Sequence, residues 1–181
     1  MRFSSRTRFR LTLFPFLIIP LLGAAAPPPS AAVREAQAQI ERAEYAAAAR
    51  TLQPLADADD PAAQAKLGML LYLGRGVPRD EARAYALFTQ AAGKESAEAM
   101  FWLGRMHLLG DGPAAQVADA DREAARWYFE AGRRGHAEAQ YTLGLLFMAG
   151  TGVEKNEDEA RRWIRRAADA GFEEARKFLA K

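Results

Sequence analysis

The strongest constraint on this chain is an internal repeat of 36 residues, which decides the class of fold before any single motif does. A Leu-Gly pair recurs at spacings of 36 and then 40 residues, and a Gly-x-Gly motif follows each pair at the same two spacings. The three pairs begin at Leu67, Leu103 and Leu143. An alanine beyond each motif recurs at 40 and then 36 residues, which locates a four-residue insertion between Gly112 and Ala124. The chain is therefore predicted to stack repeated structural units on one another.

Each repeat has the pattern of two helices. Apolar residues at i, i+4 and i+8, such as Ala63, Leu67 and Leu71, predict a first helix with one apolar face. The Gly-x-Gly motif predicts its end, because glycine adopts the left-handed conformation without a Cβ penalty. A second helix with apolar residues at i, i+3, i+4 and i+7 is expected to start near Asp80 in the first unit and Asn156 in the third. We expect eight or nine helices and no sheet.

The repeated pattern resembles a known family. An Ala-Gln-x-x-Leu-Gly start, the Gly-x-Gly-Val turn and a later Ala-x-x-Trp-Tyr-x-x-Ala-Ala stretch are similar to the Sel1-like repeat, a relative of the tetratricopeptide repeat. The middle unit departs from the pattern at Met100, His107 and Pro113, which replace a glutamine, an aromatic residue and a valine. The resemblance implies an all-α fold, a right-handed α-solenoid of antiparallel helix pairs. It also implies a role as a protein-protein interaction adaptor or scaffold.

The first 26 residues have the three-part order of a secretory signal peptide. Residues 1–10 are basic, residues 11–22 form a short apolar run, and residues 23–26 are small. The apolar run is shorter than the roughly 18 residues that a spanning helix needs, and it contains Pro15 and Pro20. We therefore expect a periplasmic or secreted protein. An uncleaved membrane anchor is the alternative, and the cleavage point stays open between Ala25, Ala26 and Ala32.

The expected organisation follows from the repeat and its flanks. The successive segments are a signal peptide at 1–26, a Pro-rich spacer at 27–31, a TPR-like N-terminal capping helix pair at 32–60, repeats at 61–96, 97–136 and 137–171, and a C-terminal capping helix at 172–181.

Charge and composition exclude several classes of function. The four arginines of the first ten residues account for the basic balance, and without them 21 basic residues face 23 acidic ones, so nucleic-acid binding has no support. The chain has no cysteine and only two histidines. His107 takes an aromatic core position and is expected to be partly buried and hydrogen-bonded, whereas His136 is expected to be solvated. No catalytic residue, metal ligand or cofactor site is predicted, and the sequence does not specify an oligomeric state.

A candidate partner-binding site lies on the first helices, which we expect to line the concave face of the solenoid. Phe101 and Trp102 are large aromatics at positions where the repeat does not require them, and Arg105 and Tyr141 are expected beside them. Aromatic and arginine side chains often anchor interfaces, so these four residues are predicted to bind a peptide or a partner domain. The alternative is that Phe101 and Trp102 pack between units.

The function predicted from these features is that of an adaptor in the bacterial envelope, without enzymatic activity. One alternative is a secreted β-lactamase-like hydrolase. It is disfavoured because the Sel1-like proteins described as such enzymes are rich in cysteine. Another alternative is a module that binds peptidoglycan or polysaccharide, which the expected aromatics and location would suit.

Overall fold

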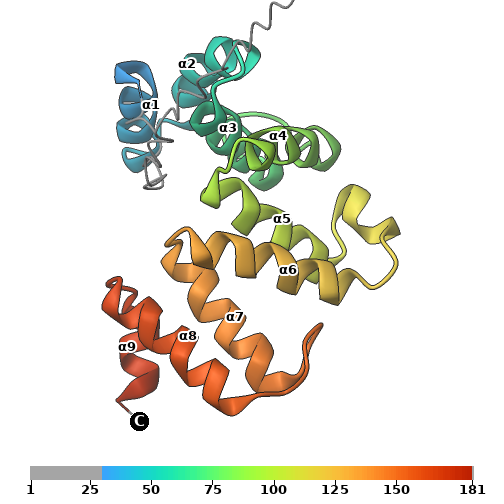
Figure 1. Ribbon diagram of the computed structural model, residues 1–181. Coiled ribbons are helices and arrows are strands. Elements are labelled where there is room, and N and C mark those ends of the chain that lie inside the picture. Colours follow the sequence, from blue (N-terminus) through green and yellow to red (C-terminus); the bar gives the residue numbers. More distant parts are fainter. Residues whose placement is uncertain (1–29, 181) are drawn as a thin grey trace, which may run out of the picture.

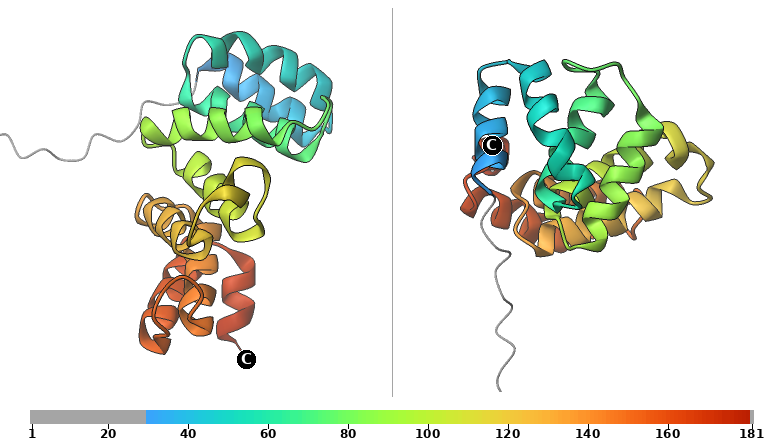
Figure 2. Two further views of the ribbon diagram at one scale, coloured as in Figure 1. Left: turned by 90° about the vertical axis from the view of Figure 1, so that its right-hand side faces the viewer. Right: turned by 90° about the horizontal axis from the view of Figure 1, so that it is seen from above.

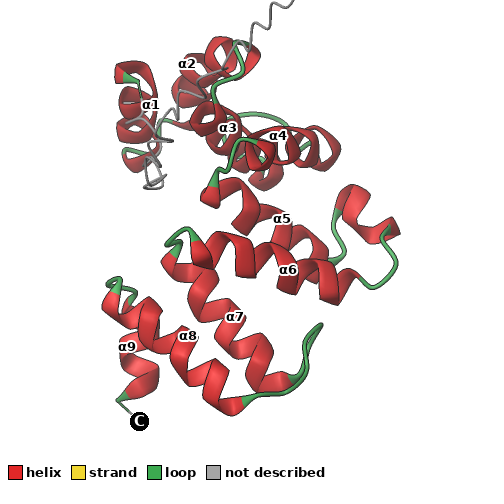
Figure 3. Cartoon of the chain, in the orientation of Figure 1, coloured by secondary structure: helices red, strands yellow, loops and turns green. Residues whose placement is uncertain are grey.

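The computed structural model describes residues 30–180, which form nine α-helices, one short 3-10 helix and no strand (Figures 1 and 3). The expected export segment at 1–26 lies outside the described residues, as do residues 27–29 of the spacer. The helices are α1 (Ala31–Glu41), α2 (Tyr45–Asp57), α3 (Pro61–Leu73), α4 (Glu81–Gly93), α5 (Ala97–Leu109), η1 (Gly112–Gln116), α6 (Ala120–Arg133), α7 (Ala137–Ala149), α8 (Glu157–Asp169) and α9 (Glu173–Leu179).

Successive helices pack against one another along a curved stack. In Figure 1 the chain descends from α1 and α2 at the top to α8 and α9 at the bottom, and both ends of the stack lie to the left of its middle. The side view in Figure 2 shows the units as layers one below another. The predicted all-helical solenoid is confirmed.

The second helices begin where local sequence predicts. The side chains of Asp80 and Asn156 accept hydrogen bonds from the backbone N–H groups of Arg83 and Glu159, which satisfies donors that have no partner within the helix. The second unit differs, because Asp119 precedes α6 with a left-handed φ of 60° and makes no side-chain capping bond.

The second glycine of each Gly-x-Gly motif brings two units into contact. Gly152 has a φ of +66°, and a Cβ built on it would lie 2.0 Å from the carbonyl oxygen of Asp121 at the start of α6. Gly76 meets the start of α2 in the same way, with the backbone nitrogen of Ala46 at 2.3 Å from the added Cβ. The motif therefore does more than end a helix, since its last residue lies against the preceding second helix.

A buried glutamine joins neighbouring units in two of the three repeats. The Nε2 of Gln64 donates to the carbonyl oxygen of Ala56 at 3.3 Å, and the Nε2 of Gln140 donates to that of Gly132 at 2.8 Å. Both acceptors lie near the C-terminus of the preceding second helix. The second unit has the buried Met100 at this position and therefore lacks this hydrogen bond to the preceding unit.

The inserted segment of the second unit is structured. It forms η1, which packs against α4 and α5 and buries Ala114 completely. Just before it, the carboxylate of Asp111 accepts a hydrogen bond from the hydroxyl of Tyr72 on α3. The insertion is therefore part of the contact between the first two units.

The buried apolar residues form two clusters. The main cluster runs from Val33 in α1 to Trp163 in α8 without interruption. The smaller cluster lies at the C-terminal end, where Ile164 and Ala175 are buried together with other residues of α8 and α9. The last helix is thus attached through a packing cluster of its own.

Candidate partner-binding surface

Phe101 and Trp102 lie inside the stack. They are 5% and 9% exposed, so the alternative interpretation, packing between units, describes both. The Trp102 ring stacks on Phe88 of the preceding unit, with centroids 5.9 Å apart and planes 6° apart. Phe101 stacks on His136 at 4.5 Å. In this conformation the two side chains stabilise the fold and offer little surface to a partner.

Arg105 is half-buried next to these aromatics. Its guanidinium lies 5.5 Å from the centre of the Trp102 ring, a cation-π arrangement. Its buried Nε has no hydrogen-bond partner. Burial raises the pKa of Glu138 on the neighbouring α7, and Arg105 opposes that shift. Arg105 therefore keeps only part of its side chain exposed, next to the Trp102 ring and under the influence of the Glu138 carboxylate.

Tyr141 lies apart from the other three predicted residues. Its ring is half-buried against α9, with centroids 5.4 Å from Phe172 and 6.3 Å from Phe178. The structure thus brings Phe101, Trp102 and Arg105 together and places Tyr141 at the contact with the C-terminal helix. Binding by these residues stays a prediction, and it depends on the surface that Arg105 and Tyr141 keep exposed.

Two exposed leucines on the same helices were missed by the sequence interpretation. Leu109 at the end of α5 is 58% exposed, and Leu145 on α7 is 37% exposed. Leu145 and Arg105 occupy equivalent positions, each two residues after the leucine of the Leu-Gly pair. That equivalence was the signal that could have identified Leu145. Together, Arg105, Leu109 and Leu145 define what we call the first-helix face.

The two histidines are both partly or wholly withdrawn from water. His107 is buried, and its Nε2 lies 3.4 Å from the hydroxyl of Tyr85, while its Nδ1 has no partner. The expectation that His136 is solvated is wrong, because its ring stacks on Phe101 and its Nδ1 accepts a hydrogen bond from the backbone N–H of Ala139. His136 therefore caps the N-terminus of α7. Asp60 and Ser96 cap the first helices α3 and α5 of the other two units in the same way.

Burial lowers the pKa of His107 from the ordinary value of 6.5, and it does the same for His136. For His107, Glu123 raises the pKa and Arg126 lowers it as smaller influences. A histidine with a lowered pKa in the folded state binds fewer protons there than in the unfolded state. The stability of the protein should therefore fall as the pH falls below 6.5.

We expect His107→Phe to reduce this acid sensitivity. Phenylalanine stands at the equivalent position of the third unit, Phe147, and it leaves no unsatisfied buried nitrogen. The variant should be as stable as the wild type or about 1 kcal/mol more stable at pH 7, with a larger advantage at pH 5. Urea unfolding at both pH values measures this. His136→Ser keeps a capping side chain and removes the other histidine of lowered pKa, so it should reduce the acid sensitivity as well. An unchanged pH dependence in His107→Phe would contradict the prediction.

Neither a metal site nor a membrane span is evident within residues 30–180. No group of three or more histidine, cysteine, aspartate or glutamate side chains in that part of the chain is placed to hold a metal ion. No helix in the same residues is long and apolar enough to cross a membrane.

Comparisons with known proteins place these units in a family. The family described as Sel1 repeat matches residues 61–95, 97–136 and 137–172. Chitin synthase regulatory factor 3 of Schizosaccharomyces pombe is 34% identical over 65% of this chain and 13% of its own length. The ERAD-associated E3 ubiquitin-protein ligase component HRD3B of Arabidopsis thaliana is 33% identical over 58% of this chain and 16% of its own length. The chain thus spans less than a fifth of these curated relatives.

A solved structure agrees with the sequence matches. The Sel1 repeat protein from Oxalobacter formigenes superposes with a TM-score of 0.68 and is 31% identical, and the superposition covers 79% of this chain and 57% of that one. The matched residues include every Leu-Gly pair, Gly-x-Gly turn and second-helix stripe from which the repeat was predicted. This chain belongs to the Sel1 repeat family.

Proposed function

We propose that this protein is an adaptor of the bacterial envelope that binds partner proteins on its first-helix face and catalyses no reaction. The observation that carries the proposal is the exposure of Leu109 and Leu145, which share one face of the first helices with Arg105 by helix and repeat register. The other large apolar side chains of residues 30–180 are mostly packed. Exposed apolar side chains next to an arginine are typical of interaction surfaces.

The relatives support a role in assembly. One is named a regulatory factor of chitin synthase and another a component of a ubiquitin ligase, so both names describe proteins that act with an enzyme. Export is supported by the basic, apolar and small segments of residues 1–26, which have the order of a secretory signal. The partner is therefore expected among periplasmic or secreted proteins.

The test is a pull-down from envelope extract with the purified wild type and the double variant Leu109→Ser, Leu145→Ser. Both side chains are exposed, so the fold should survive, and we expect recovery of the partner to fall to about a tenth or less. The matched control is Leu179→Ser, a leucine of α9 that is 41% exposed and lies outside the first-helix face. Equal recovery of the partner by the double variant and the wild type would contradict the proposal.

The binding role predicted for Arg105 and Tyr141 can be tested with conservative substitutions that preserve packing. Arg105→Ala removes the charge, and Tyr141→Phe removes only the hydroxyl while leaving the packing against Phe172 and Phe178 intact. If these residues take part in binding, each variant should weaken recovery while thermal unfolding stays within a few degrees of the wild type.

A further inference from the structure

We propose that the protein has a second binding surface, consisting of grooves between its units that accept an extended peptide with a bulky apolar side chain next to a carboxylate. The main groove lies between α2 and α3, and an equivalent groove lies between α6 and α7. Second helices, Gly-x-Gly turns and inward-facing residues of α3 and α7 line these grooves. Arg105, Leu109 and Leu145 are not among the lining residues, so this surface is distinct from the first-helix face.

The main groove has an apolar floor and a basic rim. It holds about 300 Å³, and Ala49, Leu67 and Leu71 are among the residues that line it. Arg50 and Arg83 stand among its other lining residues. A depression of about 610 Å³ at the start of α4 adjoins it and shares Leu71 and Arg83 with it. Because the two hollows share Leu71, Pro78 and Arg83, an extended chain segment could occupy both.

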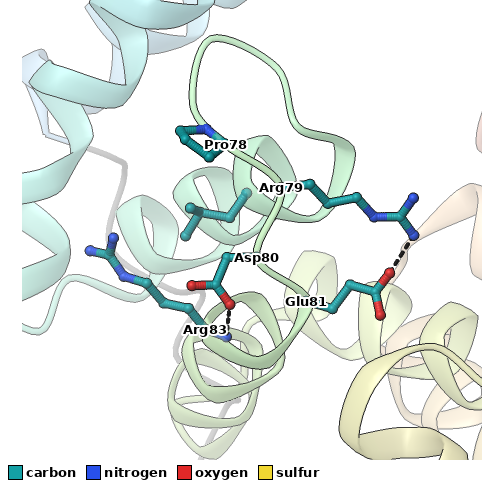
Figure 4. A pocket seen from close by; sticks show the side chains of 6 residues that line it. Pro78, Arg79, Asp80, Glu81 and Arg83 are labelled. Carbon is teal, nitrogen blue, oxygen red and sulfur yellow. Dashed lines mark hydrogen bonds and ion pairs between the residues drawn. The ribbon is translucent and has the colours of Figure 1, made fainter.

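Figure 4 shows the depression at the start of α4 from close by, with the side chains that line it. In Figure 4 the side chains of Arg83 and Arg79 extend in opposite directions from the start of α4. Arg79 is paired with Glu81, while Asp80 accepts from the backbone N–H of Arg83 and so caps the helix. The guanidinium of Arg83 donates to the neutral side chain of Gln53 at 2.6 Å, so its charge is not matched by a carboxylate there.

The second groove repeats the first in sequence and structure. It holds about 230 Å³ between α6 and α7. Its floor positions correspond one by one to those of the main groove, with Ala125 for Ala49, Leu143 for Leu67, Phe147 for Leu71 and Val153 for Val77. The correspondence between the units is fixed by the second glycine of each Gly-x-Gly motif. These glycines contact Tyr45, Glu81 and Asp121 at equivalent positions of α2, α4 and α6.

The corresponding place between the first and second units is filled by the protein itself. Tyr85 stands where the open grooves have Ala49 and Ala125. Its ring lies 5.8 Å from that of His107, which takes the floor position of Leu71 and Phe147. A tyrosine at this one position thus closes the groove, and an alanine leaves it open.

The open grooves also differ from the closed place in charge. Each open groove has an arginine directly after its alanine, Arg50 and Arg126, whereas the closed place has Ala86. Arg50 makes no hydrogen bond or ion pair within residues 30–180, so its guanidinium is available to a ligand. Arg126 is partly neutralised by Glu123 at 2.8 Å, which makes the groove at α2 the stronger of the two. A guanidinium binds carboxylate and phosphate through two parallel hydrogen bonds, and of these two groups an unmodified peptide supplies the carboxylate.

The carboxylate has two chemical sources, an acidic side chain or the free C-terminus of the peptide. Two phage-displayed random heptapeptide libraries separate them, one displayed with a free C-terminus and one displayed internally. Both libraries are selected on the purified wild type and on the double variant Ala49→Tyr, Ala125→Tyr. This variant places in each open groove the tyrosine that fills the closed place at position 85.

We expect the wild type to enrich peptides in which a large apolar residue lies next to aspartate, glutamate or the free C-terminus. The double variant should fail to enrich them. For a synthesised peptide from the selection, Arg50→Ala should weaken binding about tenfold or more, because one charge-assisted contact is lost. The matched control is Arg161→Ala, an exposed arginine of α8 outside the grooves, which should change binding less than about twofold.

Recovery of the same peptides by the double variant would overturn the proposal, as would enrichment of peptides without a carboxylate or no enrichment at all. If the tyrosine variant fails to fold, judged by circular dichroism, the comparison of Arg50→Ala with Arg161→Ala decides alone. The variant Leu109→Ser, Leu145→Ser should bind the selected peptides as the wild type does, so the two surfaces can fail separately.

Discussion

Replacing Gly152 with alanine should lower the free energy of unfolding by about 2–4 kcal/mol. Two effects add. The residue has a φ of +66°, which costs a residue with a Cβ about 1–2 kcal/mol, and the new Cβ would lie 2.0 Å from the carbonyl oxygen of Asp121. Because the obstacle is backbone rather than a flexible side chain, the contact can be relieved only by moving the third unit away from α6. Urea unfolding followed by circular dichroism measures the loss.

Two other glycines separate these effects. Gly110 also has a positive φ, +68°, but nothing lies within 4 Å of a Cβ built on it, so Gly110→Ala should show the conformational cost alone. Gly93 has neither feature and ends α4, so Gly93→Ala should leave stability unchanged or raise it slightly. If Gly152→Ala cost no more than Gly110→Ala, the contact between the turn and the preceding helix would not matter for stability.

Trp102→Ala should be at least as damaging, with an expected loss of about 3–5 kcal/mol. The indole is 9% exposed and packs against rings from three places in the chain. Tyr72 lies at 5.6 Å, Phe88 at 5.9 Å and Phe101 at 5.4 Å between ring centres. Removing it leaves a cavity between the first and second units, and thermal or urea unfolding reports the cost.

Trp127→Ala is the matched control for this prediction. Trp127 is only partly buried, on α6, with Arg126 over its ring at 4.1 Å, so its loss should cost clearly less. The comparison also bears on binding. An anchor residue at a surface would lower partner recovery while stability stayed constant, and such a result for Trp102→Ala would contradict the packing seen here.

The helices and their ends could be predicted because they depend on nearby residues. Asp80 and Asn156 cap helices that follow them directly, and Gly74 takes the left-handed conformation at the end of α3. The depth of Phe101 and Trp102 could not be predicted in the same way. Helical periodicity indicates which face of α5 they occupy, but only the approach of α4 decides how much of that face is covered.

The grooves also depend on contacts between units. Alanine and tyrosine fit the repeat equally well at positions 49, 85 and 125, so the pattern alone does not distinguish an open groove from a filled one. The capping role of His136 is different, because its equivalence to Asp60 and Ser96 was visible in the sequence. A unit-by-unit comparison of the positions before each first helix would have found it.

The separate apolar cluster at the C-terminal end has a consequence for how the molecule opens. Ile164 and Ala175 pack with Phe172 and Phe178 and do not belong to the main cluster. Detaching α9 therefore exposes a few side chains at that end and leaves the continuous core from α1 to α8 closed. Spontaneous opening should begin at this end, so the last helix is where proteases first gain access and where amide protons first exchange with solvent.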